Sequence, residues 1–220
     1  SYPSFNSNNA WEFTEDVRRN RATQDVYEPG STFKIITASA AIEEKIVRPT
    51  DTIDTNPGYI NLPGRSRPVY DTHRYGVMTF EDVIVKSSNV GAIKVALRTG
   101  ADRFAKYVRR FGFGEAMAPD VIGVSRGLWS DANLTDSALA SAAMGYQVSV
   151  TPLQMVTAVS AIAGARILYI FTNLHEFHSF GQLFALRSGG LVAYGGFLGG
   201  FAGAALHARI EALPAPMIFD

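Results

Sequence analysis

Apolar residues recur at helical spacing in several stretches of the chain, each bounded by turn-forming residues. The first long stretch follows the break at Pro29 and Gly30 and continues until Arg48 and Pro49 interrupt it. Its apolar positions are Phe33, Ile36, Ala40 and Ala41. This spacing predicts a helix that begins at about Ser31.

Two shorter helices are predicted next, on either side of a Ser-Ser-Asn sequence. Thr79 followed by two acidic residues is typical of a helix start, and the helix is expected to end just before Ser87. Asn89 is expected to cap the helix after it. The apolar face of that second helix is Val90, Ile93 and Leu97.

Two further helices are predicted towards the C-terminus. Residues from Gly100 to Gly112 combine one apolar stripe with a basic face, which is typical of a surface helix. Thr151, Pro152 and Gln154 form a strong helix start, with a capping residue, a proline at the first position and a reciprocal side chain. The helix is expected to be largely buried through Leu153, Val156, Val159, Ile162 and Ala163.

One β-structure is predicted. Tyr59–Leu62 and Pro68–Asp71 flank the turn Pro63-Gly64, which favours a small two-stranded hairpin serving as a surface flap. Residues 1–26 are expected to be loop with one short helix, and residues 115–134 to be irregular. The chain is therefore expected to be mainly α with a small β-hairpin.

Composition indicates a change in the chain after about residue 166 and gives no reason to expect nucleic acid as a partner. Residues 167–220 carry only two of the 20 basic and three of the 20 acidic residues, so this part suits a different environment from the rest. Zero net charge and the lack of a basic cluster with interleaved aromatics give no reason to expect nucleic acid. The chain has no cysteine, hence neither disulfide nor thiolate metal site. No secretion leader is visible after Ser1, so if the chain is an exported protein, its N-terminus is expected to be missing here.

Ser31 and Lys34 are candidates for nucleophilic chemistry. Residues three apart on a helix share a face, and a serine becomes a good nucleophile when a neighbouring base takes its proton. Burial and the positive end of the helix dipole lower a lysine pKa, so that an amine serves as that base. A serine three residues before a lysine also occurs by chance about once in a chain of this size.

The flanking sequences make the chemical interpretation specific. The chain resembles class B penicillin-binding proteins from residue 1 to about residue 163, and the matching pieces keep the order of that family. They are PSFN at Pro3–Asn6, YEPGSTFK at Tyr27–Lys34, KSSNVGAIKVA at Lys86–Ala96, FGFG at Phe111–Gly114 and VTPLQMVTAVSAIA at Val150–Ala163.

The resemblance implies a serine D,D-transpeptidase that binds β-lactams and acts on peptidoglycan stem peptides, without a cofactor. It implies Ser31 as the acylated nucleophile, Lys34 as its base, Ser87 as a proton relay and Asn89 as a substrate ligand. The alternative for Ser87, Ser88 and Asn89 is a plain turn and helix cap.

The sequence departs from the family pattern in three places. A Pro-Gly-Glu turn is replaced by Pro119-Asp120, Gly164-Ala165-Arg166 stands where an Asn-Gly-Gly turn is usual, and no Lys-Thr-Gly occurs anywhere. The resemblance then implies the helical lobe of a β-lactamase-like α+β fold with most or all of the central sheet missing. Loss of one oxyanion donor from the Lys-Thr-Gly strand is expected to slow acylation about a hundred- to a thousandfold.

Residues from about 164 to 220 have a likeness of their own. GARILYI at Gly164–Ile170 and LRSGGLVAYGGFLGG at Leu186–Gly200 resemble prolipoprotein diacylglyceryl transferase, a membrane enzyme. Ser188–Leu206 is 19 residues without a charge and predicts a membrane helix; the alternative is a buried helix weakened by its seven glycines. Arg166 and Tyr194 lie in the matching segments. The chain is thus expected to be a fusion of two partial segments, 1–163 and 164–220.

The expected location is the bacterial cell membrane, with the catalytic part on its extracytoplasmic face. His175 and His178 flank Glu176, but their spacing is one residue short of a metalloprotease motif, and a polar loop at the membrane rim is favoured over a zinc site. No metal is expected. The competing hypothesis for function is an inert fusion fragment or a non-catalytic membrane segment.

Overall fold

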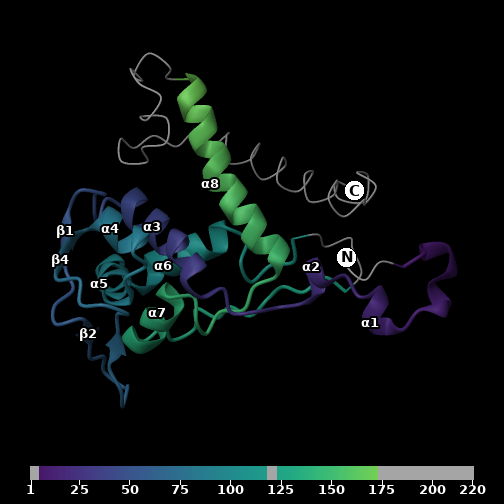
Figure 1. Cartoon of the computed structure of the whole chain (residues 1–220), viewed down its shortest axis with the longest axis horizontal. Coiled ribbons are helices and arrows are strands. Elements are labelled where there is room, and N and C mark those ends of the chain that lie inside the picture. Colours follow the sequence, from purple (N-terminus) through teal and green to yellow (C-terminus); the bar gives the residue numbers. More distant parts are fainter. Residues whose placement is uncertain (1–4, 118–122, 173–220) are drawn as a thin grey trace. The chain divides into compact units, whose positions relative to one another are not determined.

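A computed structural model describes residues 5–117 and 123–172, which form two compact units. The first unit contains residues 5–27, 115–117, 123–127 and 150–172; the second contains residues 28–114 and 128–149. Figure 1 traces the elements of each unit. The predicted boundary at about residue 163 and the predicted membrane helix at 188–206 stay predictions, and the membrane helix lies outside the described residues.

The first unit is made of helices around a short antiparallel bridge between Tyr27 and Val150. Its elements are the 3-10 helix η1 (Ser7–Glu12) and the helices α1 (Glu15–Arg18), α2 (Arg21–Gln24) and α8 (Pro152–Thr172). Helix α2 packs against α8. The one short helix predicted for residues 1–26 is three short helical segments here.

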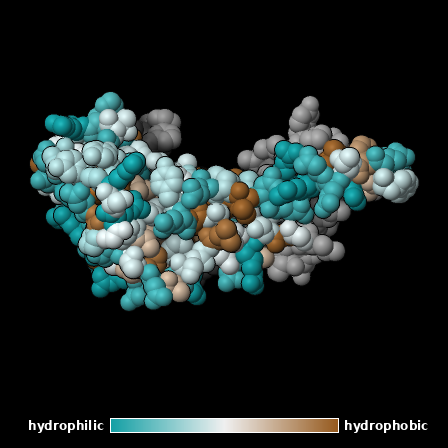
Figure 2. All heavy atoms as spheres, turned by 90° about the horizontal axis from the view of Figure 1, so that it is seen from below, coloured by the Kyte–Doolittle hydropathy of each residue, from teal (hydrophilic) through white to brown (hydrophobic). Residues whose placement is uncertain are grey.

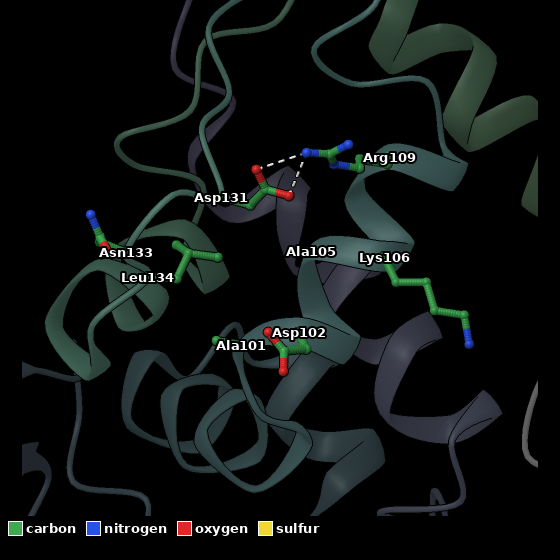
Figure 3. A pocket seen from close by; sticks show the side chains of 8 residues that line it. All are labelled: Ala101, Asp102, Ala105, Lys106, Arg109, Asp131, Asn133 and Leu134. Atoms are coloured by element: carbon green, nitrogen blue, oxygen red, sulfur yellow. Dashed lines mark hydrogen bonds and ion pairs between the residues drawn. The ribbon is translucent and has the colours of Figure 1, made fainter.

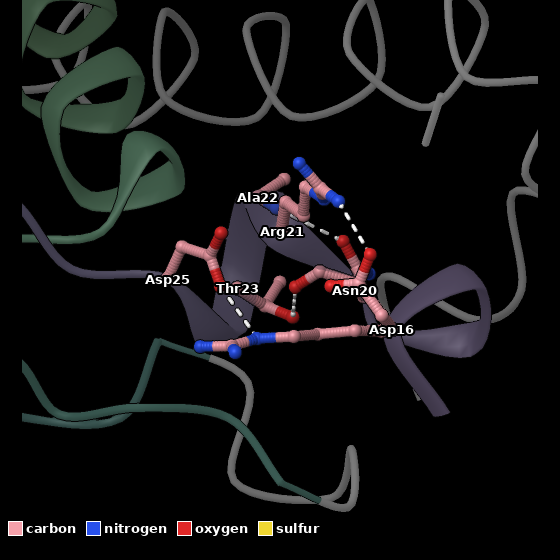
Figure 4. Close-up of polar contacts among 7 residues, drawn as sticks. Asp16, Asn20, Arg21, Ala22, Thr23 and Asp25 are labelled. Atoms are coloured by element: carbon pink, nitrogen blue, oxygen red, sulfur yellow. Dashed lines mark hydrogen bonds and ion pairs between the residues drawn. The ribbon is translucent and has the colours of Figure 1, made fainter. Parts of the chain in front are cut away.

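Local polar contacts set the ends of α1 and α2. The Asn20 side chain accepts a hydrogen bond from the backbone of Ala22 at 3.2 Å, and Thr23 Oγ1 donates to the carbonyl of Asn20 at 3.3 Å. Arg21 pairs with Asp16 at 3.0 Å, as Figure 4 shows. These polar side chains therefore bind free backbone groups between the two helices, which is consistent with helices of about one turn each.

Helix α8 begins as predicted but is more exposed than predicted. The Thr151 backbone donates to Gln154 Oε1 at 2.8 Å, and the Gln154 backbone donates to Thr151 Oγ1 at 3.2 Å, a reciprocal capping box. The prediction of a largely buried helix was wrong for Val156 and Val159, which are 41% and 48% exposed. Apolar residues occur around most of α8, and only some of them find packing partners among the described residues.

The second unit packs five α-helices with two small sheets. Its helical elements are the 3-10 helix η2 (Gly30–Phe33) and the helices α3 (Lys34–Glu43), α4 (Phe80–Val85), α5 (Asn89–Thr99), α6 (Ala101–Arg110) and α7 (Asp136–Ala143). The strands are β1 (Thr52–Asp54), β2 (Tyr59–Ile60), β3 (Val69–Tyr70) and β4 (Val77–Thr79). The expectation of a mainly α chain is confirmed for the described residues.

The predicted hairpin is present, and a second sheet was missed. Strands β2 and β3 pair antiparallel with Tyr59 opposite Tyr70. Strands β1 and β4 pair antiparallel with Ile53 opposite Met78. The β1–β4 pairing joins segments more than 20 residues apart, so it could not be predicted from a short turn between the two strands.

Helix α5 lies at the centre of the second unit, and α3, α4, α6 and α7 all pack against it. One apolar cluster joins α3 and α5 to the β1–β4 sheet, with Ile53, Phe80 and Val95 at most 1% exposed. A second cluster joins Leu62 of the hairpin loop to α5 and α7. Burial of these side chains is the main favourable contribution to folding of this unit.

The helix starts on either side of the Ser-Ser-Asn sequence differ from the prediction in one residue. Thr79 caps α4, accepting from the Asp82 backbone, as predicted. The cap of α5 is Ser88, which accepts from the Gly91 backbone at 2.9 Å, and Asn89 is the first helical residue. The prediction that Asn89 is the cap was wrong by one position, because the serine hydroxyl is the side chain that reaches the free amide.

Gly91 sets the closeness of α5 to α4. A Cβ atom at this position would lie 2.6 Å from Val83 Cγ2 and 2.7 Å from Val83 Cγ1. We expect Gly91→Ala to destabilise the chain by about 1 kcal/mol net, because overpacking at about 1–3 kcal/mol exceeds the gain in helix propensity. Urea denaturation measures this. In a Val83→Ala background the same substitution is expected to be neutral or stabilising, and equal penalties in both backgrounds would contradict the contact.

A membrane span places requirements on the helices and the surface of the described part of the chain. Within residues 5–117 and 123–172, no helix is both long and apolar enough to span a membrane. On the face in Figure 2, hydrophobic residues form separate small groups on a mostly hydrophilic surface.

Candidate active site

Ser31 lies on η2, directly before the α-helix that carries Lys34. The helix predicted to begin at about Ser31 is present, but its first turn, Gly30–Phe33, is a 3-10 helix and α3 starts at Lys34. Residues three apart are eclipsed in a 3-10 helix, so Ser31 and Lys34 share a side of this turn. The Lys34 backbone donates to the Ser31 carbonyl, and the Ser31 side chain is exposed.

The Lys34 ammonium is the centre of the cluster. Its Nζ atom donates to Ser87 Oγ at 2.9 Å, to the Ser87 carbonyl at 2.6 Å and to Asn89 Oδ1 at 2.8 Å. The side chain is only 2% exposed. Three donors therefore meet three acceptors, which is the full capacity of an ammonium group.

Burial lowers the pKa of Lys34. Desolvation lowers the pKa of Lys34 from its ordinary value to about 8, while the negative charge of Asp71 acts in the opposite direction. A substantial fraction of Lys34 is then neutral near physiological pH. A neutral amine beside a serine hydroxyl accepts its proton and raises its nucleophilicity.

The segment before Ser31 is fixed by a backbone contact with the end of α7. The Gly30 amide donates to the Gly145 carbonyl at 3.0 Å, and a Cβ atom on Gly145 would lie 2.0 Å from the Gly30 carbonyl oxygen. Both glycines have positive φ. The close approach leaves no room for a side chain at Gly145, whereas at Gly30 it is the positive φ that favours glycine.

Asp71 holds the Ser-Ser-Asn connection from the other side. Its carboxylate accepts hydrogen bonds from Ser88 Oγ at 2.7 Å, from the Val90 amide at 3.0 Å and from the Asn89 amide. The Asn89 side chain also donates to the Tyr70 carbonyl at 3.0 Å. The end of β3 therefore contacts the residues that bind Lys34.

A surface hollow of about 720 Å³ elsewhere in the second unit is lined by none of the four candidate residues. It lies between α6 and the 131–134 segment, and the ion pair of Arg109 with Asp131, at 2.6 Å, is at its edge (Figure 3). Of its charged side chains, Arg109 pairs with Asp131 and Lys106 pairs with Glu44 outside the hollow. We assign it no role.

The structure brings together three of the four residues singled out from the sequence. Lys34, Ser87 and Asn89 form one hydrogen-bonded cluster, although Lys34 is 53 and 55 residues from the other two. Ser31 lies three residues before Lys34 on the same turn, and among the described residues no side-chain hydrogen bond joins it to the cluster. Asp71 was missed, because a single aspartate after a short strand carries no spacing signal.

Arg166 is the only residue singled out in the second likeness that falls in the described part of the chain. It lies on α8 and is 6% exposed. Tyr194 and the histidines at 175 and 178 lie outside the described residues. Among residues 5–117 and 123–172 no group of three metal-binding side chains occurs.

Comparison with known proteins places the chain in a family. A model of the penicillin binding protein transpeptidase domain matches residues 1–175. The chain belongs to this family. The match continues past the predicted limit of about 163, and α8 runs unbroken across that position to Thr172.

Named relatives agree with the family. The chain is 34% identical to the peptidoglycan D,D-transpeptidase FtsI of Escherichia coli K12 over 161 residues, which is 73% of this chain and 27% of that protein. It is 36% identical to the stage V sporulation protein D of Bacillus subtilis 168 over 152 residues, 69% of this chain and 24% of the relative. The chain thus spans about a quarter of the length of these relatives.

Solved structures show the same fold relationship. The transpeptidase domain of penicillin-binding protein 3 from Burkholderia pseudomallei matches with a TM-score of 0.62 and 34% identity, over 66% of this chain and 44% of that one. A structure described as a peptidoglycan glycosyltransferase from Burkholderia ambifaria matches with a TM-score of 0.63, over 66% and 46% of the two chains. About two thirds of this chain therefore shares its fold with part of a penicillin-binding transpeptidase domain.

Proposed function

We propose that this chain carries the acylation site of a serine D,D-transpeptidase, which attacks the D-Ala-D-Ala end of a peptidoglycan stem peptide. The observation that carries the proposal is the bonding of a buried lysine, one turn after a serine, to both Ser87 and Asn89. This arrangement suits acyl transfer without a metal or cofactor. β-Lactams, which present a reactive amide carbonyl, would acylate the same serine.

The proposed chemistry follows from the positions of the protons. Neutral Lys34 takes the Ser31 Oγ proton as Oγ attacks the carbonyl carbon of the penultimate D-alanine, which gives a tetrahedral intermediate. The C–N bond to the terminal D-alanine then breaks, and the leaving amine takes a proton from Ser87 Oγ, which is replaced from Lys34. An amine of a second stem peptide then attacks the ester carbonyl and loses a proton to Lys34, which is neutral again; the C–O bond to Ser31 breaks, the new amide is released, and Ser31 Oγ takes that proton back from Lys34.

Asn89 fits the role of substrate ligand in this proposal. Its amide oxygen is bound to Lys34 and its amide nitrogen to the Tyr70 carbonyl, so the side chain is held in a single orientation. An oriented amide aligns a peptide substrate with little entropy cost.

Acylation by a labelled penicillin, read by intact mass, tests the proposal. We expect one adduct per chain, located on Ser31, and none on Ser31→Ala. Ser39→Ala is the matched control, because Ser39 lies on α3 and its hydroxyl is bound to the Ile35 carbonyl at 2.8 Å. Absence of any adduct on the unmodified chain contradicts the proposal, and a slow but stoichiometric adduct agrees with the impaired rate expected without Lys-Thr-Gly.

The pH dependence of acylation is a second expected result. Only neutral Lys34 acts as the base, and a pKa of about 8 means that its neutral fraction rises about tenfold per pH unit below 8. The acylation rate is therefore expected to rise with pH and to level off above about 8. Rates measured from pH 6 to 9 check this, and a rate independent of pH would exclude Lys34 as the base.

The location and the C-terminal segment stay proposals as well. We propose that the catalytic part acts on the extracytoplasmic face of the bacterial cell membrane, where peptidoglycan is cross-linked, and that residues beyond the family match derive from a membrane segment like that of prolipoprotein diacylglyceryl transferase. Sequencing the genomic locus across codons 155–170 tests the fusion. Two intact separate genes would show that the junction is not natural.

A further inference from the structure

The Ser-Ser-Asn connection between α4 and α5 contains Ser87 and Asn89 of the proposed site. Hydrogen bonds within α4 and α5 alone do not fix the conformation of these two residues. Ser87 has positive φ, an unfavourable backbone conformation for a serine. Asn89 is the first residue of α5, where backbone amides have no partner within the helix. Something outside the connection must fix it.

Asp71 meets this requirement with both carboxylate oxygens. Oδ1 accepts from the Asn89 and Val90 amides, and Oδ2 accepts from Ser88 Oγ at 2.7 Å. Ser88 is fully buried, and its hydroxyl links Asp71 to α5 because it also accepts a hydrogen bond from the Gly91 amide. Three of the first amides of α5 are thus satisfied by one carboxylate and the serine that it binds.

Asp71 is itself anchored to the hairpin. Its amide donates to the Gly58 carbonyl at 2.9 Å, directly after the β2–β3 pairing ends. The neighbouring Tyr70 carbonyl accepts from the Asn89 side chain. The predicted surface flap is therefore connected to the site through two consecutive residues.

We infer that Asp71 is a positioning residue for this site: its carboxylate fixes the Ser87–Asn89 connection on α5 so that Ser87 and Asn89 hold Lys34 beside Ser31. The inference deepens the proposed function and rests on it for the kinetic consequence. Its structural consequence, the dependence of the Lys34 pKa on Asp71, is measurable without any reaction.

The charges around Lys34 make Asp71 the group to test. On neighbouring elements, Lys86 after α4 pairs with Asp82 at 3.8 Å, and Lys94 on α5 donates to the Asp54 carbonyl at 2.6 Å. From α6, Arg103 and Lys106 pair with Glu44 at the opposite end of α3. Asp71 is the ionisable group whose charge acts on Lys34, and it raises the pKa that burial lowers.

Three variants separate position from charge. Asp71→Asn removes the charge and the acceptor for Ser88 but keeps an oxygen for the amides. Ser88→Ala removes only the hydroxyl contacts and leaves the charge. Asp54→Asn is the matched control, because Asp54 likewise accepts from a nearby backbone amide, that of Asn56 at 2.8 Å, and the charge that acts on it is Lys94.

The first measurement is the titration of Lys34 by NMR in the full chain labelled with ¹³C-lysine, with Lys34→Met used to assign the signal. Removal of the Asp71 charge is expected to lower the pKa of Lys34 in Asp71→Asn, whereas Ser88→Ala and Asp54→Asn leave it near the unmodified value. A Lys34 titration unchanged in Asp71→Asn, with unchanged amide signals for residues 87–90, would overturn the inference.

The second measurement is acylation by labelled penicillin across pH. Loss of hydrogen bonds to a charged group is expected to reduce the plateau rate about ten- to a hundredfold in Asp71→Asn, and less in Ser88→Ala. The rise of the rate with pH moves to lower pH in Asp71→Asn only. If the unmodified chain forms no adduct but its Lys34 responds to Asp71, the proposed function fails while the positioning role stands.

Discussion

Replacing Lys34 by methionine is expected to reduce acylation of Ser31 by a labelled penicillin about a hundred- to ten-thousandfold, the usual contribution of a positioned general base. Methionine fills a similar buried space but takes no proton. The Ser87 carbonyl, Ser87 Oγ and Asn89 Oδ1 all lose their donor in this variant, so the two other site residues are released as well. Time-resolved intact mass gives the rate.

Lys94→Met is the matched control for that substitution. Lys94 also donates to a backbone carbonyl, that of Asp54, but it lies outside the cluster. We expect an unchanged acylation rate in Lys94→Met, and circular dichroism should show both variants folded. A Lys34→Met chain that is acylated as fast as the unmodified chain would contradict the assignment of Lys34 as the base.

The substitution Gly145→Ala is expected to have the largest effect on folding. The new Cβ atom would lie 2.0 Å from the Gly30 carbonyl oxygen and 2.7 Å from the Gly30 amide nitrogen, so the backbone itself has to move. We expect a loss of about 3 kcal/mol or more in the free energy of unfolding, measured by urea denaturation. Because Gly30 precedes Ser31, we also expect acylation to fall about a hundredfold through displacement of the nucleophile.

Gly64→Ala separates the close contact from backbone strain. Gly64 has a φ of +78°, nearly the same as the +80° of Gly145, but no atom lies within 4 Å of a Cβ built there. We expect Gly64→Ala to cost only the left-handed strain, about 1–2 kcal/mol, with acylation unchanged. Equal losses in the two variants would mean that the approach of Gly145 to Gly30 is not what positions the nucleophile turn.

Local sequence signals predicted most of the longer helices and much of the candidate site, but α7 was missed. The capping residues Thr79 and Thr151 start helices where the sequence predicts, because a side-chain oxygen three residues before a free amide is a short-range contact. Ser31 and Lys34 fall on one turn because they are only three residues apart in the sequence. Spacing along the chain is sufficient for such features.

Other features depended on which segments meet in three dimensions. The β1–β4 pairing, the exposure of Val159 on α8 and the contact of Gly145 with Gly30 all join or separate residues distant in sequence. The cap of α5 was misplaced by one residue because Ser88 and Asn89 are equally good capping types, and Asp71 decides between them by binding the Ser88 hydroxyl.

By itself, the sequence predicted most of the longer helices, the hairpin and the family motifs, because these depend on periodicity and on contacts within a few residues. The tertiary structure alone decided that Lys34 meets Ser87 and Asn89, and that Asp71 binds the Ser88 hydroxyl and the Asn89 amide. The physical reason is that hydrogen bonds across more than 50 residues, and the burial that lowers the pKa of Lys34, exist only when the helices pack.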